Sequence, residues 1–266
     1  MAAIAQQPAR LRPVSSKVQV AFAAVDAAAV FELFDNVAAA VRGALDVADR
    51  SAAGERAGQY GLDLDADAAA LAVLTAAPVD VLSEESGRHR RGFDVCVVVD
   101  PVDGSTNASR GVPVYATSLC ACDASGPWVA AVTDLVRGVT YRAERGAGAT
   151  RDGAPIRVAD PVAAPDAIVA VNGWSAERPP TAQSRALGCA SLELCLVADG
   201  TLDGYVGFDP DGHGAWDYLG GWLILTEAGG VAIDRSGRDL FTTDHADRRT
   251  IVAASGAALL DRLVTA

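Results

Sequence analysis

Two aspartates, Asp100 and Asp103, follow an apolar stretch at residues 93–99 that only Asp94 interrupts. Seven residues with four valines and no Gly or Pro predict a buried strand, and its end would place the two carboxylates together. Residues 104–107 predict a tight turn and a helix N-terminus, whose free N–H groups favour an anion. Paired carboxylates beside such a site indicate divalent metal ions that hold a phosphate. Asp-Pro and Asp-Gly are also ordinary turn dipeptides, so this stretch alone leaves a simple turn equally open.

Further acidic residues follow other predicted elements. Glu84 and Glu85 come directly after a short predicted strand, and Asp217 stands at the start of a predicted helix. Each has an ordinary explanation: the glutamates form a charged loop, and the helix dipole stabilises Asp217. With Asp100 and Asp103, these residues could instead form a metal site assembled from distant parts of the chain.

Composition bounds the kind of protein. The 266 residues are half apolar and 21% charged, which is typical of a folded globular chain. The net charge of −12 argues against a nucleic-acid-binding surface. No signal peptide and no stretch of ~18 apolar residues is found, and an odd count of five cysteines without CxxC spacing favours a reducing compartment. We therefore expect a cytoplasmic protein without nucleic-acid or membrane partners. No metal-ligand spacing relates His89, His213 and His245, which disfavours a zinc hydrolase.

The remaining elements are predicted from apolar periodicity and from turn residues. Helices are predicted over residues 18–48 (one or two), 66–76, 191–198 and 216–228, with a short one at the end of the chain. Strands are predicted over residues 79–82, 93–99, 115–122, 128–135, 138–142, 167–172, 204–208 and 250–254. The polar, glycine-containing residues 145–154 predict a connector into a second half of the chain.

Three segments carry a resemblance to a known family. Residues 97–105 match its signature of an apolar strand followed by Asp-Pro-Ile/Leu-Asp-Gly-Thr/Ser. Trp-Asp at 216–217 and Glu-Ala-Gly-Gly at 227–230 match a second signature, and Ser-Glu-Glu at 83–85 matches Gly-Glu-Glu with serine in place of glycine. Over residues 60–255 the chain resembles the inositol monophosphatase-like phosphatases, which are Mg²⁺-dependent and Li⁺-sensitive.

The resemblance implies two or three Mg²⁺ ions in each active site. Glu84, Asp100 and the backbone carbonyl of Val102 would hold the first ion. Asp100 would bridge to a second ion, which Asp103 and Asp217 complete. A third, looser ion near Glu84 is also implied.

Glu84, Ser105 and Asp67 are the catalytic residues that the resemblance implies. Glu84 and the Ser105 hydroxyl would orient the attacking water on the first metal, without a covalent phosphoenzyme. Asp67, in preference to Asp65, matches the family's acidic residue at the start of the preceding helix, and it would contribute to the third ion through water.

The substrate-binding residues implied in the same way are Asp103, Gly104, Ser105, Gly188, Cys189 and Ala190. The backbone N–H groups of Gly104 and Ser105 would hold the phosphate, and Thr106 or Asn107 would cap the helix. Residues 185–191 resemble the family stretch whose backbone borders the alcohol part of the substrate. A helix start with small residues for close packing explains this segment equally well.

Departures from the family pattern leave the substrate open. Ala108 stands where members often have an aromatic residue, and residues 59–61 stand where an upstream lysine is usual. The hydroxyl-binding glutamate of inositol-specific members has no match. Asp209 or Asp211 could replace it, although Asp-Pro-Asp-Gly is typical of a turn.

The fold implied by the resemblance is a layered α/β/α/β/α sandwich. Residues 1–153 would form an α+β half with most metal ligands, and residues 154–266 an α/β half that contributes Asp217 and the substrate-side wall. The implied function is hydrolysis of a small phosphorylated metabolite, such as an inositol phosphate or a sugar phosphate. Histidinol phosphate and a 3′-phosphoadenosine nucleotide are alternative substrates. A catalytically silent protein that binds a ligand or partner is the alternative of another class. Dimers are usual in the family, so a homodimer is expected.

Overall fold

The computed structural model of the chain describes residues 26–56, 58–176 and 180–265. Its first helix, α1 (Ala27–Val47), is a single element that begins where the Asp26 carboxylate accepts a hydrogen bond from the Ala29 N–H at 2.8 Å. Residues 18–25 of the predicted helix lie outside the described residues. The buried side chains of α1, which are Val30, Phe34, Val37, Ala38, Val41 and Leu45, recur at helical spacing and face the first sheet.

The second helix, α2 (Gly61–Leu74), begins five residues before the predicted start at residue 66. The Asp63 carboxylate accepts a hydrogen bond from the Tyr60 N–H at 2.8 Å, which satisfies a donor at the helix start. The prediction followed the alanine-rich run and missed this polar first turn.

The first sheet has eight strands in the order β2-β1-β3-β4-β5-β6-β7-β8. Its strands are β1 (Asp80–Ser83), β2 (Gly87–His89), β3 (Cys96–Asp103), β4 (Ala116–Asp123), β5 (Gly126–Asp134), β6 (Thr140–Glu144), β7 (Gly148–Arg151) and β8 (Ala154–Pro155). Within this sheet β1 and β3 pair in parallel, and the other neighbouring strands pair antiparallel. The connector predicted over residues 145–154 is wrong, because this stretch contains β7 and the start of β8 and continues the sheet. The division of the chain at residues 153/154 stays a prediction.

The second sheet has five strands in the order β10-β9-β11-β13-β12. They are β9 (Ile168–Asn172), β10 (Gln183–Arg185), β11 (Gly204–Gly207), β12 (Val231–Asp234) and β13 (Ile251–Ala254). The helices of this part are η1 (Ala164–Asp166), α4 (Ala190–Ala198), α5 (Ala215–Glu227) and α6 (Ala257–Val264), while the short α3 (Ser105–Arg110) follows β3.

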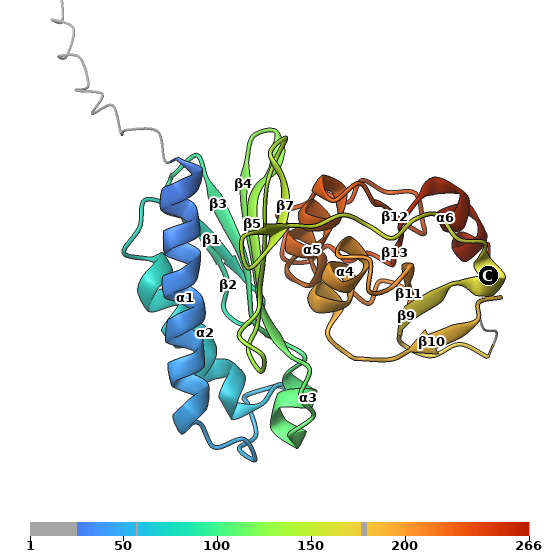
Figure 1. The fold of residues 1–266 in the computed structure, drawn as a ribbon. Coiled ribbons are helices and arrows are strands. Elements are labelled where there is room, and N and C mark those ends of the chain that lie inside the picture. Colours follow the sequence, from blue (N-terminus) through green and yellow to red (C-terminus); the bar gives the residue numbers. More distant parts are fainter. Residues whose placement is uncertain (1–25, 57, 177–179, 266) are drawn as a thin grey trace, which may run out of the picture.

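These elements form the predicted α/β/α/β/α layers (Figure 1). Helices α1 and α2 cover one face of the first sheet, α4 and α5 lie between the two sheets, and α6 lies beyond the second. Strand β3 is buried on both faces: Val97 and Val99 pack in the cluster with α1 and α2, and Val98 packs in the cluster with α4 and α5. This double burial explains why the strand reads as a continuous apolar run.

Two further expectations concern the whole chain. All five cysteines are buried and free, so none forms a disulfide. None of the helices in the described part of the chain combines the length and the apolar character needed to cross a bilayer.

Candidate active site

Three carboxylates that are distant in sequence meet where the first sheet contacts α5. Glu84, Asp100 and Asp217 each offer an oxygen, and these oxygens lie within 4.8 Å of one another. Ser83 and Val99 are paired in the parallel β1–β3 ladder, and the Glu84 N–H donates to the Val99 carbonyl at 3.1 Å. The ladder therefore places Glu84 beside Asp100, and the first turn of α5 brings Asp217 to them.

Strand β3 does not end at Val99 as predicted but continues through Asp103. Its pairing with β4 shifts register between Asp100, opposite Ser118, and Asp103, opposite Ala116. Residues three apart on a regular strand point to opposite faces, and a bulge with one extra residue brings them to the same face. Asp100 and Asp103 accordingly both reach the side that α4 and α5 cover.

The Asp103 carboxylate is bound by the start of α4 and lies outside the group of three. Its Oδ2 accepts a hydrogen bond from the Ser191 N–H at 2.6 Å. Burial raises the pKa of Asp103, while hydrogen bonds from Ser191, Cys189 and Ala190 lower it in part. Residues 185–191 thus contain a helix start, as one interpretation expected, because α4 begins at Ala190. The first residues of this helix also contact Asp103, a predicted metal ligand.

Gly104 makes the turn between β3 and α3 with a backbone φ of 91°, which favours glycine. The Val102 N–H donates to Asp100 Oδ1 at 2.9 Å, and the Ser105 hydroxyl donates to the Val102 carbonyl at 2.9 Å. These bonds tie the predicted metal-binding and phosphate-binding residues into one compact turn.

The predicted capping of α3 by Thr106 or Asn107 is wrong, because Gly104 occupies the N-cap position. The Asn107 side chain instead donates to the carbonyls of Val114 at 2.8 Å and Leu187 at 2.7 Å. The Asn107 side chain therefore connects the predicted substrate-binding segment, residues 185–191, to the residues just before β4.

Asp67 does not start a helix, contrary to the prediction. It lies in the middle of α2, where its carboxylate accepts a hydrogen bond from the buried Ser83 hydroxyl at 2.5 Å. Asp63 occupies the first turn of α2, lines the same pocket as Glu84 and contacts Ser105. The prediction failed because it placed the helix start too late.

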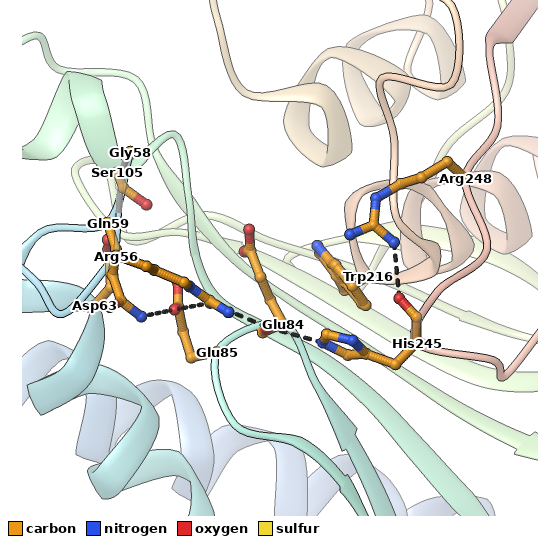
Figure 2. Close-up of a pocket in the computed structure, with 10 residues that line it drawn as sticks. All are labelled: Arg56, Gly58, Gln59, Asp63, Glu84, Glu85, Ser105, Trp216, His245 and Arg248. Atoms are coloured by element: carbon orange, nitrogen blue, oxygen red, sulfur yellow. Dashed lines mark hydrogen bonds and ion pairs between the residues drawn. The ribbon is translucent and has the colours of Figure 1, made fainter.

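A pocket of about 300 Å³ opens above these groups (Figure 2). It is lined by Arg56, Gly58, Gln59, Asp63, Glu84, Glu85, Ser105, Trp216, His245 and Arg248. The His245 Nε2–H donates to the Glu84 carbonyl at 3.1 Å, and its ring lies 4.8 Å from the Trp216 ring. Sequence reasoning missed Arg56, His245 and Arg248, since they come from irregular loops without a motif.

The site suits cations. Burial raises the pKa of Glu84 to about 7, and the neighbouring Glu85 adds to the shift. The pKa values of Asp100 and Asp217 are also raised well above the usual range. Burial is the larger cause, and repulsion from the Glu84 carboxylate is the second. Converging carboxylates that repel one another supply the hard oxygen donors that Mg²⁺ prefers, so these residues fit the implied ions.

Residues 209–212 form the expected turn, in which the Gly212 N–H donates to the Asp209 carbonyl at 3.2 Å. The Asp211 carboxylate pairs with Arg238 at 2.6 Å. Neither aspartate lines the pocket described above.

Comparison with known proteins places the chain in a family. The model of the inositol monophosphatase family matches residues 17–266. A fructose-1,6-bisphosphatase/inositol-1-monophosphatase of Thermococcus kodakarensis is 34% identical over 71% of this chain and 74% of its own length. The Nus factor SuhB of Vibrio cholerae is 31% identical over 66% of this chain and 68% of its own length. A solved inositol monophosphatase–fructose 1,6-bisphosphatase is 26% identical with a TM-score of 0.80, over 88% of this chain and 98% of that one. The chain therefore belongs to the inositol monophosphatase family of phosphoric monoester hydrolases.

Proposed function

We propose that this protein is a Mg²⁺-dependent phosphomonoesterase that hydrolyses a small phosphorylated metabolite, such as an inositol phosphate or a sugar phosphate. The observation that carries the proposal is the convergence of Glu84, Asp100 and Asp217, whose oxygens lie within 4.8 Å of one another. Asp103 and the Val102 carbonyl border this group and would complete the ligand set. When bound, Mg²⁺ supplies Lewis acidity, which polarises the phosphoryl oxygens and lowers the pKa of water.

The residues of the chain itself would place the phosphate and handle one proton. The N–H groups of Gly104 and Ser105 would donate to the phosphoryl oxygens. The single hydrogen of the Ser105 hydroxyl can point to Val102 or to Asp63, and its lone pairs remain able to accept a hydrogen from water. As water attacks phosphorus, its proton would pass to Ser105 Oγ, whose own hydrogen would move to the Asp63 carboxylate. As the bond from water to phosphorus forms, the bond from phosphorus to the alcohol oxygen would break, and the leaving alkoxide would take a proton from solvent. Asp63 would release its proton to solvent afterwards, so the products would be inorganic phosphate and the free alcohol. Asp63 would thus be a catalytic residue that accepts a proton, whereas the sequence had implied that Asp67 contributes to the third ion through water.

The direct test is phosphate release from a panel of inositol 1-phosphate, fructose 1,6-bisphosphate, histidinol phosphate and 3′-phosphoadenosine 5′-phosphate. We expect release from at least one compound with Mg²⁺ and none with excess EDTA. Release that persists in EDTA would contradict the metal-dependent mechanism. By family resemblance we also expect inhibition by Li⁺ and a homodimer, which sedimentation velocity would detect.

A second candidate function is binding of another macromolecule, since several relatives carry the name Nus factor SuhB. The formal net charge of −12 disfavours direct contact with nucleic-acid phosphates, so a protein partner fits better. Mg²⁺ binding without phosphate release from any compound of the panel would favour this candidate.

A further inference from the structure

The pocket holds two arginines on opposite sides of Glu84 (Figure 2). Arg56 comes from the loop before α2, and Arg248 comes from the loop between β12 and β13. Both have guanidinium groups at the pocket, but their surroundings differ.

The charge of Arg56 is already matched by a carboxylate. Its Nη2 pairs with Glu85 Oε2 and lies 3.3 Å from the Glu84 carbonyl. The Glu85 side chain is only 6% exposed and also accepts a hydrogen bond from Gln59. Among the described residues only Nη2 of Arg56 makes hydrogen bonds, but the buried Glu85 carboxylate already matches the charge of this guanidinium.

Arg248 is held by backbone carbonyls and an aromatic ring, and its charge also lowers the pKa of the Asp217 carboxylate in part. Its Nη1 donates to the backbone carbonyls of His245 at 2.8 Å and Asp247 at 2.9 Å, and its Cζ lies 4.9 Å from the centre of the Trp216 ring. Within the described ranges it forms no ion pair with an Asp or Glu side chain, and its Nε and Nη2 make no hydrogen bond. The plane of the guanidinium is therefore set while two of its nitrogens stay available.

The loop that carries Arg248 is itself anchored to the first sheet. The His245 ring donates to the Glu84 carbonyl at 3.1 Å, and Arg88 Nη1 donates to the Thr243 carbonyl at 2.6 Å. A cation held in this way is preorganised for a ligand, because binding needs little further ordering.

The position of Arg248 indicates which anion it would meet. Ser105, whose N–H belongs to the proposed phosphate site, lies on the Asp63 side of Glu84, while Arg248 lies on the Trp216 side (Figure 2). We propose that Arg248 is a specificity-determining residue that binds a second anionic group, a carboxylate or a phosphate, on the alcohol part of the substrate. The proposal rests on the phosphatase function above. A planar guanidinium suits either anion, because both accept two parallel hydrogen bonds.

Matched substrate pairs test this assignment. Fructose 1,6-bisphosphate is compared with fructose 1-phosphate, and 3-phosphoglycerate with glycerol 3-phosphate, so that a second phosphate and a carboxylate are examined separately. For at least one pair, kcat/KM of the wild-type protein should favour the member with the second anionic group by roughly tenfold or more. Arg248→Gln should abolish this preference through KM and change kcat/KM for the member without the second anionic group by no more than about threefold. Arg248→Lys should restore part of the preference. Arg157→Gln, at an arginine whose side chain is 74% exposed, is the matched control.

The outcomes separate the two proposals. Hydrolysis by the wild-type protein without preference in either pair would overturn the role of Arg248 and leave the phosphatase function standing. An equal loss of kcat/KM for the members with and without the second anionic group, in a folded Arg248→Gln protein, would also overturn it, because the arginine would then act on the reacting phosphate. No hydrolysis of any compound would overturn the phosphatase function, and this role with it.

Discussion

The carboxylate of Asp103 and the backbone N–H of Ser191 lie 2.6 Å apart, and this hydrogen bond joins β3 of the first sheet to the first turn of α4. A charged acceptor at a helix N-terminus is stabilised by both the hydrogen bond and the helix dipole. Asp103→Ala should therefore lower the free energy of unfolding by about 1–3 kcal/mol in saturating Mg²⁺, where repulsion among the carboxylates is screened. Urea unfolding measures this change. Asp94→Ala, at an exposed aspartate before the same strand, is the control, and equal stability of the two variants would contradict the argument.

Asp100 lies at the centre of the acidic group and is 2% exposed. Asp100→Asn should reduce phosphate release by about 10³-fold or more, because the side chain keeps its shape but loses the charge that holds the ions. The rise in unfolding temperature on adding Mg²⁺ should shrink in the same variant. Asp94→Asn should change neither quantity. Wild-type activity in Asp100→Asn would rule out the proposed metal site.

Asp63 and Asp67 should respond oppositely to substitution. Asp63→Asn should lower kcat at least tenfold with little loss of stability, because Asn can still accept the hydrogen bond from Tyr60 but cannot take up a proton. Asp67→Ala should leave kcat within about threefold yet lower the free energy of unfolding by about 1–3 kcal/mol, because the buried Ser83 hydroxyl loses its acceptor. Steady-state kinetics and urea unfolding of both variants decide which aspartate is catalytic. A large loss of kcat in Asp67→Ala together with near wild-type kcat in Asp63→Asn would restore the catalytic role to Asp67.

The metal-free protein should lose stability as pH rises from 6.5 to 8.5. Burial raises the pKa of Glu84 to about 7 and of Glu193 to about 8, so the folded state binds protons that the unfolded state has already released. A group with a raised folded pKa stabilises the fold at low pH, and this stability disappears as pH passes through the folded value. Glu193 alone should contribute about 2 kcal/mol over this interval. Burial lowers the pKa of His213 to about 4, so its contribution, of opposite sign, falls below the interval.

Addition of Mg²⁺ separates the two glutamates. It should remove the part of the pH dependence that belongs to Glu84, a proposed ligand, and leave the part that belongs to Glu193. Glu193→Gln should then remove most of the remainder. Urea unfolding at several pH values in EDTA and in Mg²⁺ provides the comparison, and a pH-independent stability in EDTA would contradict both assignments.

Two glycines at the ends of α3 distinguish crowding from backbone strain. Both have positive φ, 91° at Gly104 and 75° at Gly111. A Cβ at Gly104 would lie 3.0 Å from the Val114 carbonyl and 3.1 Å from the Gly188 carbonyl, whereas one at Gly111 would meet nothing within 4 Å. Gly111→Ala should lower the free energy of unfolding by about 1 kcal/mol, and Gly104→Ala should lower it by about 1–3 kcal/mol more. Gly104→Ala should also reduce activity, because the phosphate-binding turn must shift. Equal stability and activity in the two variants would contradict this reading.

The sequence by itself predicted most strands, because buried strands such as β3 carry long apolar runs and the turns between them carry Gly, Pro and Asp. The layered fold was implied by the resemblance of three sequence segments to a known family. It also singled out Glu84, Asp100 and Asp217, since each directly follows or lies within a recognisable element. Their convergence was implied by resemblance, and the parallel register of β1 and β3 supplies its physical cause.

Other features were decided only by the tertiary structure. The true start of α2 places Asp63, and not Asp67, in the first turn. There Asp63 accepts a hydrogen bond from the Tyr60 N–H and contacts Ser105, and the alanine content of the sequence does not reveal either interaction. Arg248 lies in an irregular loop, and its place at the pocket depends on stacking against Trp216, 32 positions earlier in the chain. Local sequence patterns report the periodicity of helices and strands, whereas the loops that line a pocket are placed by contacts with distant residues, and no local pattern encodes these contacts.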